Sequence, residues 1–271
     1  MHTFVKELKV RNENLFYFGL LCLSLSFVFL SLTQVTTTQV HNVNAWYKPF
    51  KFCFSTFTFA WAMGWYCHYL EDFNVKRFNW FVIFLLGFEI IYIATQAGRG
   101  QLSHYNISTS VYAALYSLMG IAAASVTIYT GYVGFLFCRR SFPNLSKHYV
   151  WAIRFAIALF VIFAFEGSLM GSRMNHNVGG MNDNSDWFIL SWSRTMGDLR
   201  VAHFVGMHAL QVLPLLSFFV FKKTKSTIIM SLLYGVLATT TLIQALQGKP
   251  FFASEAPELP TQVEIEIIEQ P

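Results

Sequence analysis

The stretch Gly197-Asp-Leu-Arg-Val-Ala-His-Phe-Val-Gly-Met-His-Ala-Leu-Gln-Val-Leu-Pro214 joins an apolar helical run to four polar side chains on one face. Asp198 stands where an N-cap residue is expected, and the apolar sequence continues to Phe221. At about 100° per residue, the polar side chains fall within a wedge of about 140°. They are Arg200, His203, His208 and Gln211. In a membrane helix such a stripe has to face protein, a ligand or a wet cavity, because ionisable groups in lipid cost several kcal/mol.

The composition predicts an integral membrane protein. Of 271 residues, 55% are hydrophobic and 12% are charged, whereas about 25% are charged in a typical soluble domain. Seven segments are long and apolar enough to cross about 30 Å of hydrocarbon. They are Leu15–Leu32, Phe50–Tyr69, Asn79–Gly98, Val111–Cys138, Tyr149–Gly171, Arg200–Phe221 and Ser226–Gln247. We therefore predict an all-α polytopic membrane protein with seven transmembrane helices between residues 15 and 247.

Lysine and arginine in the connections predict the orientation. Alternate connections carry tight basic clusters beside the predicted helix ends. These residues are Lys6, Lys9, Arg11, Lys76, Arg77, Arg139, Arg140, Lys147, Lys222, Lys223 and Lys225. Because short cytoplasmic loops are enriched in Lys and Arg, we predict that this side is cytoplasmic. The N-terminus is then inside and the C-terminus outside, in a multi-pass protein of the cell membrane, which we expect to be a bacterial cytoplasmic membrane.

The two ends of the chain flank this predicted membrane domain. Residues 1–14 are basic and are expected to form a cytoplasmic segment. The apolar run after them has no A-x-A-like exit, so it is predicted to be an uncleaved signal anchor. Residues 248–271 are rich in glutamate and proline and predict a flexible acidic tail outside the membrane.

Several classes of partner find no support in the sequence. The net charge of +5 comes mostly from the basic clusters, and no basic stripe with interleaved aromatics indicates nucleic-acid binding. The four cysteines form no C-x-x-C pair, so they predict packing and not thiol chemistry. The seventh predicted span has no lysine for a retinal Schiff base. The remaining expected partners are the lipid bilayer and a small anionic or lipophilic ligand.

The polar residues of the predicted spans gather at a common depth. In the outer half of the bilayer lie Lys51, Gln96, Arg99, Glu166, Arg173, Arg200 and His203, and nearer the middle lie Glu89, His208 and Gln211. Structural helix–helix pairs would scatter in depth, so this asymmetry predicts a single cavity open to the outside. A long connection from Ser172 to Gly197, of a length typical of lids and binding loops, lies on the same side.

Residue chemistry suggests a role for each member of this predicted cavity. Glutamate and histidine suit proton transfer, which makes Glu166, His203 and His208 the candidate catalytic residues. Arginine suits carboxylate or phosphate groups. The candidate substrate-binding residues are Lys51, Glu89, Gln96, Arg99, Arg173, Arg200 and Gln211.

A metal or haem is a further expectation that the sequence leaves open. His203 and His208 are five residues apart, a poor spacing for one metal, because the i, i+4 histidines of H-E-x-x-H share one helix face. A metal would need one of them together with Glu166 or with His104 or His176. Haem would need an axial ligand, for which His208 is the best placed, and no C-x-x-C-H exists for covalent attachment. The H-x-x-x-H element of seven-span hydrolases related to ceramidases is absent.

Three blocks of the sequence resemble uncharacterised bacterial multi-span membrane proteins. They are Asn44-Ala-Trp-Tyr-Lys-Pro-Phe-Lys51, Gln96-Ala-Gly-Arg99 and the stretch from Gly197 to Pro214. The resemblance covers most of the predicted spans and implies a polytopic helical fold, but it implies no activity.

Three classes of function therefore remain. The first is a membrane-embedded enzyme or ligand-binding protein for an anionic or lipophilic substrate, which we favour. The second is a proton- or ion-coupled transporter, with Glu89, Glu166 and His208 as a relay, although no internal repeat is apparent. The third is a sensor or assembly subunit whose polar interior only fixes the register of the helices.

Overall fold

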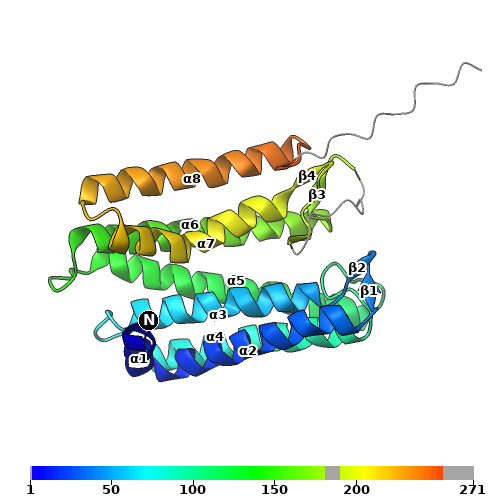
Figure 1. The fold of residues 1–271 in the computed structure, drawn as a ribbon, viewed down its shortest axis with the longest axis horizontal. Helices are drawn as coiled ribbons and strands as arrows, with labels where there is room; N and C mark the ends of the chain where they lie inside the picture. The colour runs from blue at the N-terminus through cyan, green and yellow to red at the C-terminus, as the bar shows by residue number, and fades with distance from the viewer. Residues whose placement is uncertain (1, 181–189, 253–271) are drawn as a thin grey trace, which may run out of the picture.

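In a computed structural model of the chain, described for residues 2–180 and 190–252, the helices run side by side in one bundle (Figure 1). Its helices are α1 (His2–Arg11), α2 (Glu13–Val35), α3 (Tyr47–Cys67), α4 (Val75–Gly98), α5 (Ser110–Arg139), α6 (Lys147–Arg173), α7 (Leu199–Phe219) and α8 (Thr224–Leu246). All of these except α1 and α3 are long and apolar enough to cross a membrane. The predicted all-helical, multi-span architecture is confirmed. The seventh span remains a prediction, because α3 is 21 residues long but carries Lys48 and Lys51 near its start.

Two short strand pairs mark one end of the bundle, which we call the strand end. β1 (Gln39–Val40) pairs with β2 (Val43–Asn44), and β3 (Asn177–Val178) pairs with β4 (Gly197–Asp198), both antiparallel. Figure 1 shows α1 and the α3–α4, α5–α6 and α7–α8 connections at the opposite end. The basic clusters of the sequence lie in this second group, so we call it the basic end. The helices therefore alternate in direction as the predicted orientation requires, and which end faces the cytoplasm remains a prediction.

Side-chain caps explain where several helices begin. Asn12, Asn74 and Thr109 each accept a hydrogen bond from a backbone N–H in the first turn of α2, α4 and α5. Asp198 does the same for Arg200 at the start of α7, which confirms the predicted N-cap. Such caps satisfy backbone donors that have no partner within the helix.

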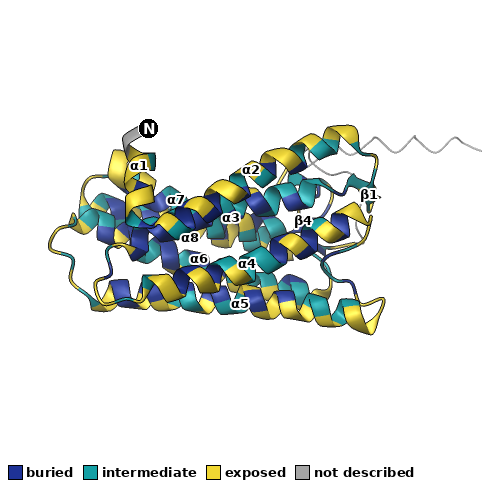
Figure 2. Ribbon diagram, turned by 90° about the horizontal axis from the view of Figure 1, so that it is seen from below, coloured by how far each residue is buried: buried dark blue, intermediate teal, exposed yellow. Residues whose placement is uncertain are grey.

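The bundle is apolar on both its inner and its outer faces. Its largest core cluster includes Leu15, Met63, Phe78 and Phe137, all fully buried. Exposed residues run along the outward faces of α2 and α5 in Figure 2, and large apolar side chains such as Ile121 are among them. Apolar outward faces are expected of helices that contact lipid, whereas a soluble bundle would present polar ones.

Glycine brings α7 close to both of its neighbours. A Cβ at Gly206 would collide with the Phe163 ring of α6, and one at Gly197 would collide with the backbone of Ala245 in α8. Small residues at such positions let helix backbones approach closely, and this close contact fixes the rotation of α7. The polar stripe of α7 is therefore held in a defined direction.

A proline inside α7 creates a link to α3. Pro214 has no N–H, so the carbonyl of Leu210, four residues earlier, loses its helical donor. The hydroxyl of Tyr66, a buried residue of α3, donates a hydrogen bond to this oxygen at 2.7 Å. The bond satisfies a backbone group that would otherwise be orphaned, and it ties the two helices together.

The segments that flank the membrane domain are described only in part. Residues 2–11 form α1, which packs against the bundle: Leu8 is fully buried and the Phe4 ring stacks on Trp65 with centroids 4.9 Å apart. The expected cytoplasmic location of this segment is still a prediction. Most of the predicted acidic tail, residues 253–271, and residues 181–189 of the long connection lie outside the described residues.

Candidate functional site

A buried carboxylate, Asp198, organises the first turn of α7. The sequence predicts this residue only as a helix cap. Asp198 receives hydrogen bonds from Arg200, from Nε to Oδ1 at 2.9 Å and from Nη2 to Oδ2 at 2.6 Å, and from the backbone N–H of Ser193 at 2.9 Å. Burial alone would raise the pKa of Asp198, but Arg200 and these hydrogen bonds outweigh burial and hold the pKa below its ordinary value. Asp198 is therefore an anion paired with Arg200.

Two cations bind the last part of the connection between α6 and α7, which contains Leu190 and Ser191 and which we call the returning loop. Arg200 Nη2 also donates to the carbonyl of Ser191, and Lys51 Nζ of α3 donates to the carbonyl of Leu190 at 3.1 Å. Lys48 lies within electrostatic range of both Lys51 and Arg200. Two of the seven predicted substrate-binding residues, Lys51 and Arg200, thus have protein partners, and they bring positive charge to one place.

Glu166 of α6 and His203 of α7 form the second part of the site. His203 Nδ1 lies 2.7 Å from the carbonyl oxygen of Phe163 and 3.4 Å from Glu166 Oε2. A carbonyl can only accept, so Nδ1 carries the proton and Nε2 keeps its lone pair. The Glu166 side chain is 6% exposed, and neither of its oxygens has a hydrogen-bond partner among the described residues. Two predicted catalytic residues are therefore neighbours.

Gly167 leaves the room that the His203 ring needs. A Cβ at this position would lie 3.0 Å from His203 Cε1, which is tighter than an ordinary van der Waals contact. An alanine here would force the imidazole to shift by a few tenths of an ångström. The Glu166–His203 geometry thus depends on a glycine in the neighbouring helix.

The α4–α5 connection adds an aromatic group to the site. His104 contacts Phe52 of α3 and Tyr116 of α5, with ring centroids 5.4 Å and 6.2 Å apart. Tyr105 packs against Tyr116 at 5.8 Å and lies within electrostatic range of Glu166. Burial raises the pKa of Tyr105 to about 12, so its hydroxyl remains a hydrogen-bond donor at neutral pH.

Two histidines of the strand end are held neutral. Burial, reinforced by Lys48 and His203, lowers the pKa of His104 well below its ordinary value. Burial, followed by the charge of Arg200, lowers the pKa of His176 to about 3. The backbone carbonyl of His176 accepts a hydrogen bond from the N–H of Leu199 at 3.0 Å, which places the residue beside the start of α7. Neutral imidazoles can accept protons or bind ligands without adding charge.

We call this group the central cluster. It consists of Lys48, Lys51, His104, Tyr105, Glu166, His176, Asp198, Arg200 and His203. Sequence reasoning weighed His104 and His176 only as metal ligands and assigned no site role to Lys48, Tyr105 or Asp198. These five residues lie at helix starts or in connections, where helical periodicity gives no direction for a side chain. In the sequence, these residues stand close to charged residues of the predicted spans, and this was the one signal that pointed to them.

Other predicted site residues lie elsewhere. His208 is one turn or more deeper on α7, with Nδ1 3.3 Å from Gln211 Oε1 and its ring 4.3 Å from that of Phe204. Glu89 is buried in α4, and its Oε1 has no hydrogen-bond partner among the described residues. Arg173 is exposed at the end of α6. His208 lies within electrostatic range of His203, and the predicted roles of these residues stay predictions.

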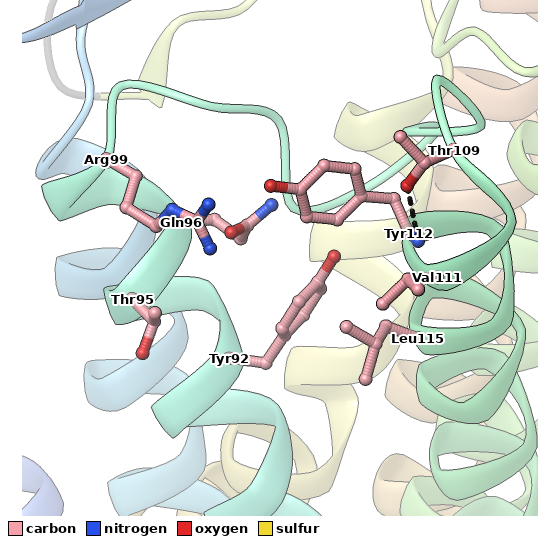
Figure 3. A pocket seen from close by; sticks show the side chains of 8 residues that line it. All are labelled: Tyr92, Thr95, Gln96, Arg99, Thr109, Val111, Tyr112 and Leu115. Carbon is pink, nitrogen blue, oxygen red and sulfur yellow. Dashed lines mark hydrogen bonds between the residues drawn. The ribbon is translucent and has the colours of Figure 1, made fainter.

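Gln96 and Arg99 belong to a different hollow, which we call the α4–α5 pocket. It has a volume of about 420 Å³ and lies between the strand-end halves of the two helices. Figure 3 shows Tyr92, Gln96 and Arg99 on α4 facing Tyr112 and Leu115 on α5. This pocket is lined by two of the residues expected at the single outer cavity, and that single cavity stays a prediction.

The sequence leaves open whether the protein binds a metal or haem. In residues 2–180 and 190–252, no group of three or more His, Cys, Asp or Glu side chains is arranged to hold a metal ion. Of the metal candidates, Glu166 and His203 are adjacent, whereas His208 has Gln211 as its hydrogen-bond partner.

Comparisons with known proteins leave the site to be interpreted by its own geometry. No protein-family model, no curated protein and no solved structure matches this chain.

Proposed function

We propose that this protein is a membrane-embedded enzyme that binds a small anionic substrate at the strand end, with Glu166 and His203 as its proton-transfer pair. In this proposal α3 is the seventh span, because it packs between α2 and α4 inside the bundle. The basic end faces the cytoplasm, so the site opens on the opposite side of the membrane.

A buried carboxylate without a hydrogen-bond partner supports this proposal most directly. Most buried polar atoms in proteins are hydrogen-bonded, because an unpaired one loses the free energy of hydration. Both oxygens of Glu166 are buried and without such a partner among the described residues, and His203 Nδ1 lies 3.4 Å from Oε2. A purely structural glutamate would be expected to have satisfied oxygens. An unsatisfied group in a cluster of titratable residues is a candidate for chemistry.

The charges around this pair favour an anion. Lys51 and Arg200 lie beside the carboxylates Asp198 and Glu166, and the histidines outside the spans are neutral. Burial, followed by the charges of Lys51 and Arg200, lowers the pKa of Lys48 to about 7, so Lys48 adds a further ammonium that is partly charged at neutral pH. An anionic carboxylate or phosphate group would be attracted there and would find N–H and O–H donors.

The geometry suggests how the pair would move a proton. His203 Nε2 has the free lone pair, so it is the atom that would accept a proton from the bound substrate. The imidazolium that results would be stabilised by Glu166 on the Nδ1 side, where the two groups are already 3.4 Å apart. Tyr105, protonated at neutral pH, would donate to the negative charge that develops on the substrate.

A test of this proposal compares the isosteric variant Glu166→Gln with Lys249→Gln, which removes an exposed charge just after α8. Purified proteins in mild detergent are incubated with a mixture of small carboxylates and phosphate esters, and mass spectrometry follows which compounds are converted. We expect the parent and Lys249→Gln to convert the same anion and Glu166→Gln to be slower by about 10²–10⁴-fold, the contribution typical of general acid–base catalysis. Thermal unfolding checks that both variants remain folded.

Equal conversion by Glu166→Gln and the parent would refute the catalytic role of the carboxylate. Failure of the parent to convert any anion, together with unchanged unfolding in their presence, would favour a structural role for the cluster.

Glu89 favours a second candidate function, proton-coupled transport. It is a buried carboxylate past the middle of α4, and its Oε1 has no hydrogen-bond partner among the described residues. Carboxyl groups inside the membrane are typical of proton relays. In protein-containing vesicles, an anion that crosses the membrane chemically unchanged, with accompanying proton movement, would favour transport over catalysis.

A further inference from the structure

We propose that the α4–α5 pocket binds the headgroup of an anionic phospholipid in the leaflet at the strand end. Arg99 contacts the phosphate, and the hydroxyls of Tyr92 and Tyr112 contact the headgroup oxygens. This site is separate from the central cluster and does not depend on the enzymatic proposal above.

Arg99 supplies a cation that has no ion pair with a carboxylate among the described residues. It is the C-cap residue of α4 and is exposed, its guanidinium carbon lies 5.9 Å from the centroid of the Tyr112 ring, and Tyr92 is within its electrostatic range. An arginine at a membrane surface often only extends its charge towards water. The guanidinium geometry also matches the oxygens of a phosphate, which it can bind with two parallel hydrogen bonds.

Tyr92 is the observation that points to a ligand. The residue is 7% exposed, and its hydroxyl is buried beside the Gln96 side chain but has no well-aligned hydrogen bond among the described residues. In Figure 3 the hydroxyls of Tyr92 and Tyr112 both point into the space between α4 and α5, beside the amide of Gln96. Tyrosine hydroxyls in buried positions normally find a partner. A headgroup oxygen in the pocket would provide one.

The remainder of the pocket suits the glycerol and upper acyl part of a lipid. Below the polar groups, Val111 and Leu115 give the wall an apolar surface. The outward faces next to it are apolar as well, with Ile91 69% exposed and Leu118 50% exposed. The volume of about 420 Å³ is within the range of small-ligand sites, roughly 300–1,000 Å³. A polar headgroup above and an apolar chain below match this gradient along the helices.

The same helix pair has a second hollow towards the basic end, and it is less suited to a headgroup. That hollow has a volume of about 510 Å³ and contains Arg77, Tyr129 and Tyr132. Tyr129 packs edge-on against Phe78 and Phe81 there. No buried tyrosine hydroxyl without a partner is found in this second hollow within the described residues. Of these two hollows, the strand-end pocket is therefore the better suited to a polar ligand.

Native mass spectrometry of the purified protein, mixed with equal amounts of phosphatidylglycerol and phosphatidylcholine, tests this inference. We expect the parent to retain phosphatidylglycerol preferentially. Arg99→Gln should reduce its retention by about tenfold, as for loss of a charge-assisted hydrogen bond, and Tyr92→Phe by severalfold. The matched control Arg173→Gln removes an exposed arginine at the same end of the bundle and should change retention less than twofold.

Three outcomes would overturn the proposal. Equal losses in Arg99→Gln and Arg173→Gln would mean that the lipid responds only to surface charge. Unchanged retention in Arg99→Gln and Tyr92→Phe, both folded by their unfolding temperatures, would mean that the pocket holds no headgroup. Displacement of the lipid by millimolar inorganic phosphate, with an equal rise in unfolding temperature from phosphate alone, would identify free phosphate as the ligand. Conversion of anions is tested with Glu166→Gln and lipid retention with Tyr92→Phe and Arg99→Gln, so the two proposals fail independently.

Discussion

The hydrogen bond between Tyr66 and the α7 backbone should stabilise the bundle more than other tyrosine bonds to the same helix. Because Pro214 removes the helical donor to Leu210, Tyr66 is the group that satisfies this buried carbonyl, at 2.7 Å. Tyr66→Phe removes only the hydroxyl and leaves the ring in its core position. The carbonyl is then buried without a partner, and α3 loses a polar link to α7.

The expected magnitude follows from two reference values. Interhelical hydrogen bonds in membrane proteins contribute about 0.6 kcal/mol on average and at most about 1.7 kcal/mol. Orphaning a buried polar group costs about 1–3 kcal/mol in general. We therefore expect Tyr66→Phe to lower the free energy of unfolding by about 1–2 kcal/mol, near the upper end of the membrane range.

Tyr234 provides the matched control. Its hydroxyl donates to the carbonyl of Val205, also on α7, at 2.6 Å. That carbonyl also lies four residues before Ala209, whose N–H is its regular helical donor. Tyr234→Phe removes an additional bond and orphans no carbonyl, so its cost should be about 0.6 kcal/mol or less.

Equilibrium unfolding in mixed micelles, at increasing denaturing detergent, measures both variants and a double-mutant cycle with Pro214→Ala. Alanine restores the backbone N–H, so Tyr66→Phe should cost about 1 kcal/mol less in the Pro214→Ala background than in the parent. Equal costs for Tyr66→Phe and Tyr234→Phe, together with an additive cycle, would refute the argument that proline creates the need for Tyr66.

Two further predictions concern the central cluster. Gly167→Ala should shift the His203 ring and reduce conversion of the anion roughly tenfold with little loss of stability, whereas Gly120→Ala, where a Cβ meets open space, should leave conversion unchanged. Because folding keeps the pKa of His176 at about 3, against 6.5 ordinarily, the unfolded state binds more protons between these values and stability falls as the pH drops through this window. Unfolding temperatures at about pH 7 and pH 5 should therefore differ less for His176→Gln than for the parent, and equal differences would contradict this.

Helix positions were predictable from the sequence because they depend on local properties. Apolar runs of sufficient length, with polar or capping residues at their ends, indicated each long helix of the bundle within a few residues. The cap at Asp198 and the apolar outer faces follow from the same local signals. The number of spans that cross the membrane was less well determined, because α3 combines a helical pattern with two lysines near its start.

The polar stripe of α7 was also a local property, since helical periodicity fixes which residues share a face. Periodicity predicted that His203 faces the interior of the bundle, and the structure places it beside Glu166. It could not predict that Arg200 would bond to Asp198 and to the Ser191 carbonyl, because that contact needs the returning loop.

Only the tertiary structure divided the polar residues between sites. Depth along a helix can be counted from the sequence, but the rotation of each helix about its axis is set by packing against its neighbours. Gly206 sets the close approach of α7 to α6 and so aims His203 at Glu166. In α4 the corresponding rotation turns Arg99 towards α5, into a pocket of its own. Residues at one depth can therefore face different neighbours, because the direction of a side chain around its helix depends on contacts that no single segment contains.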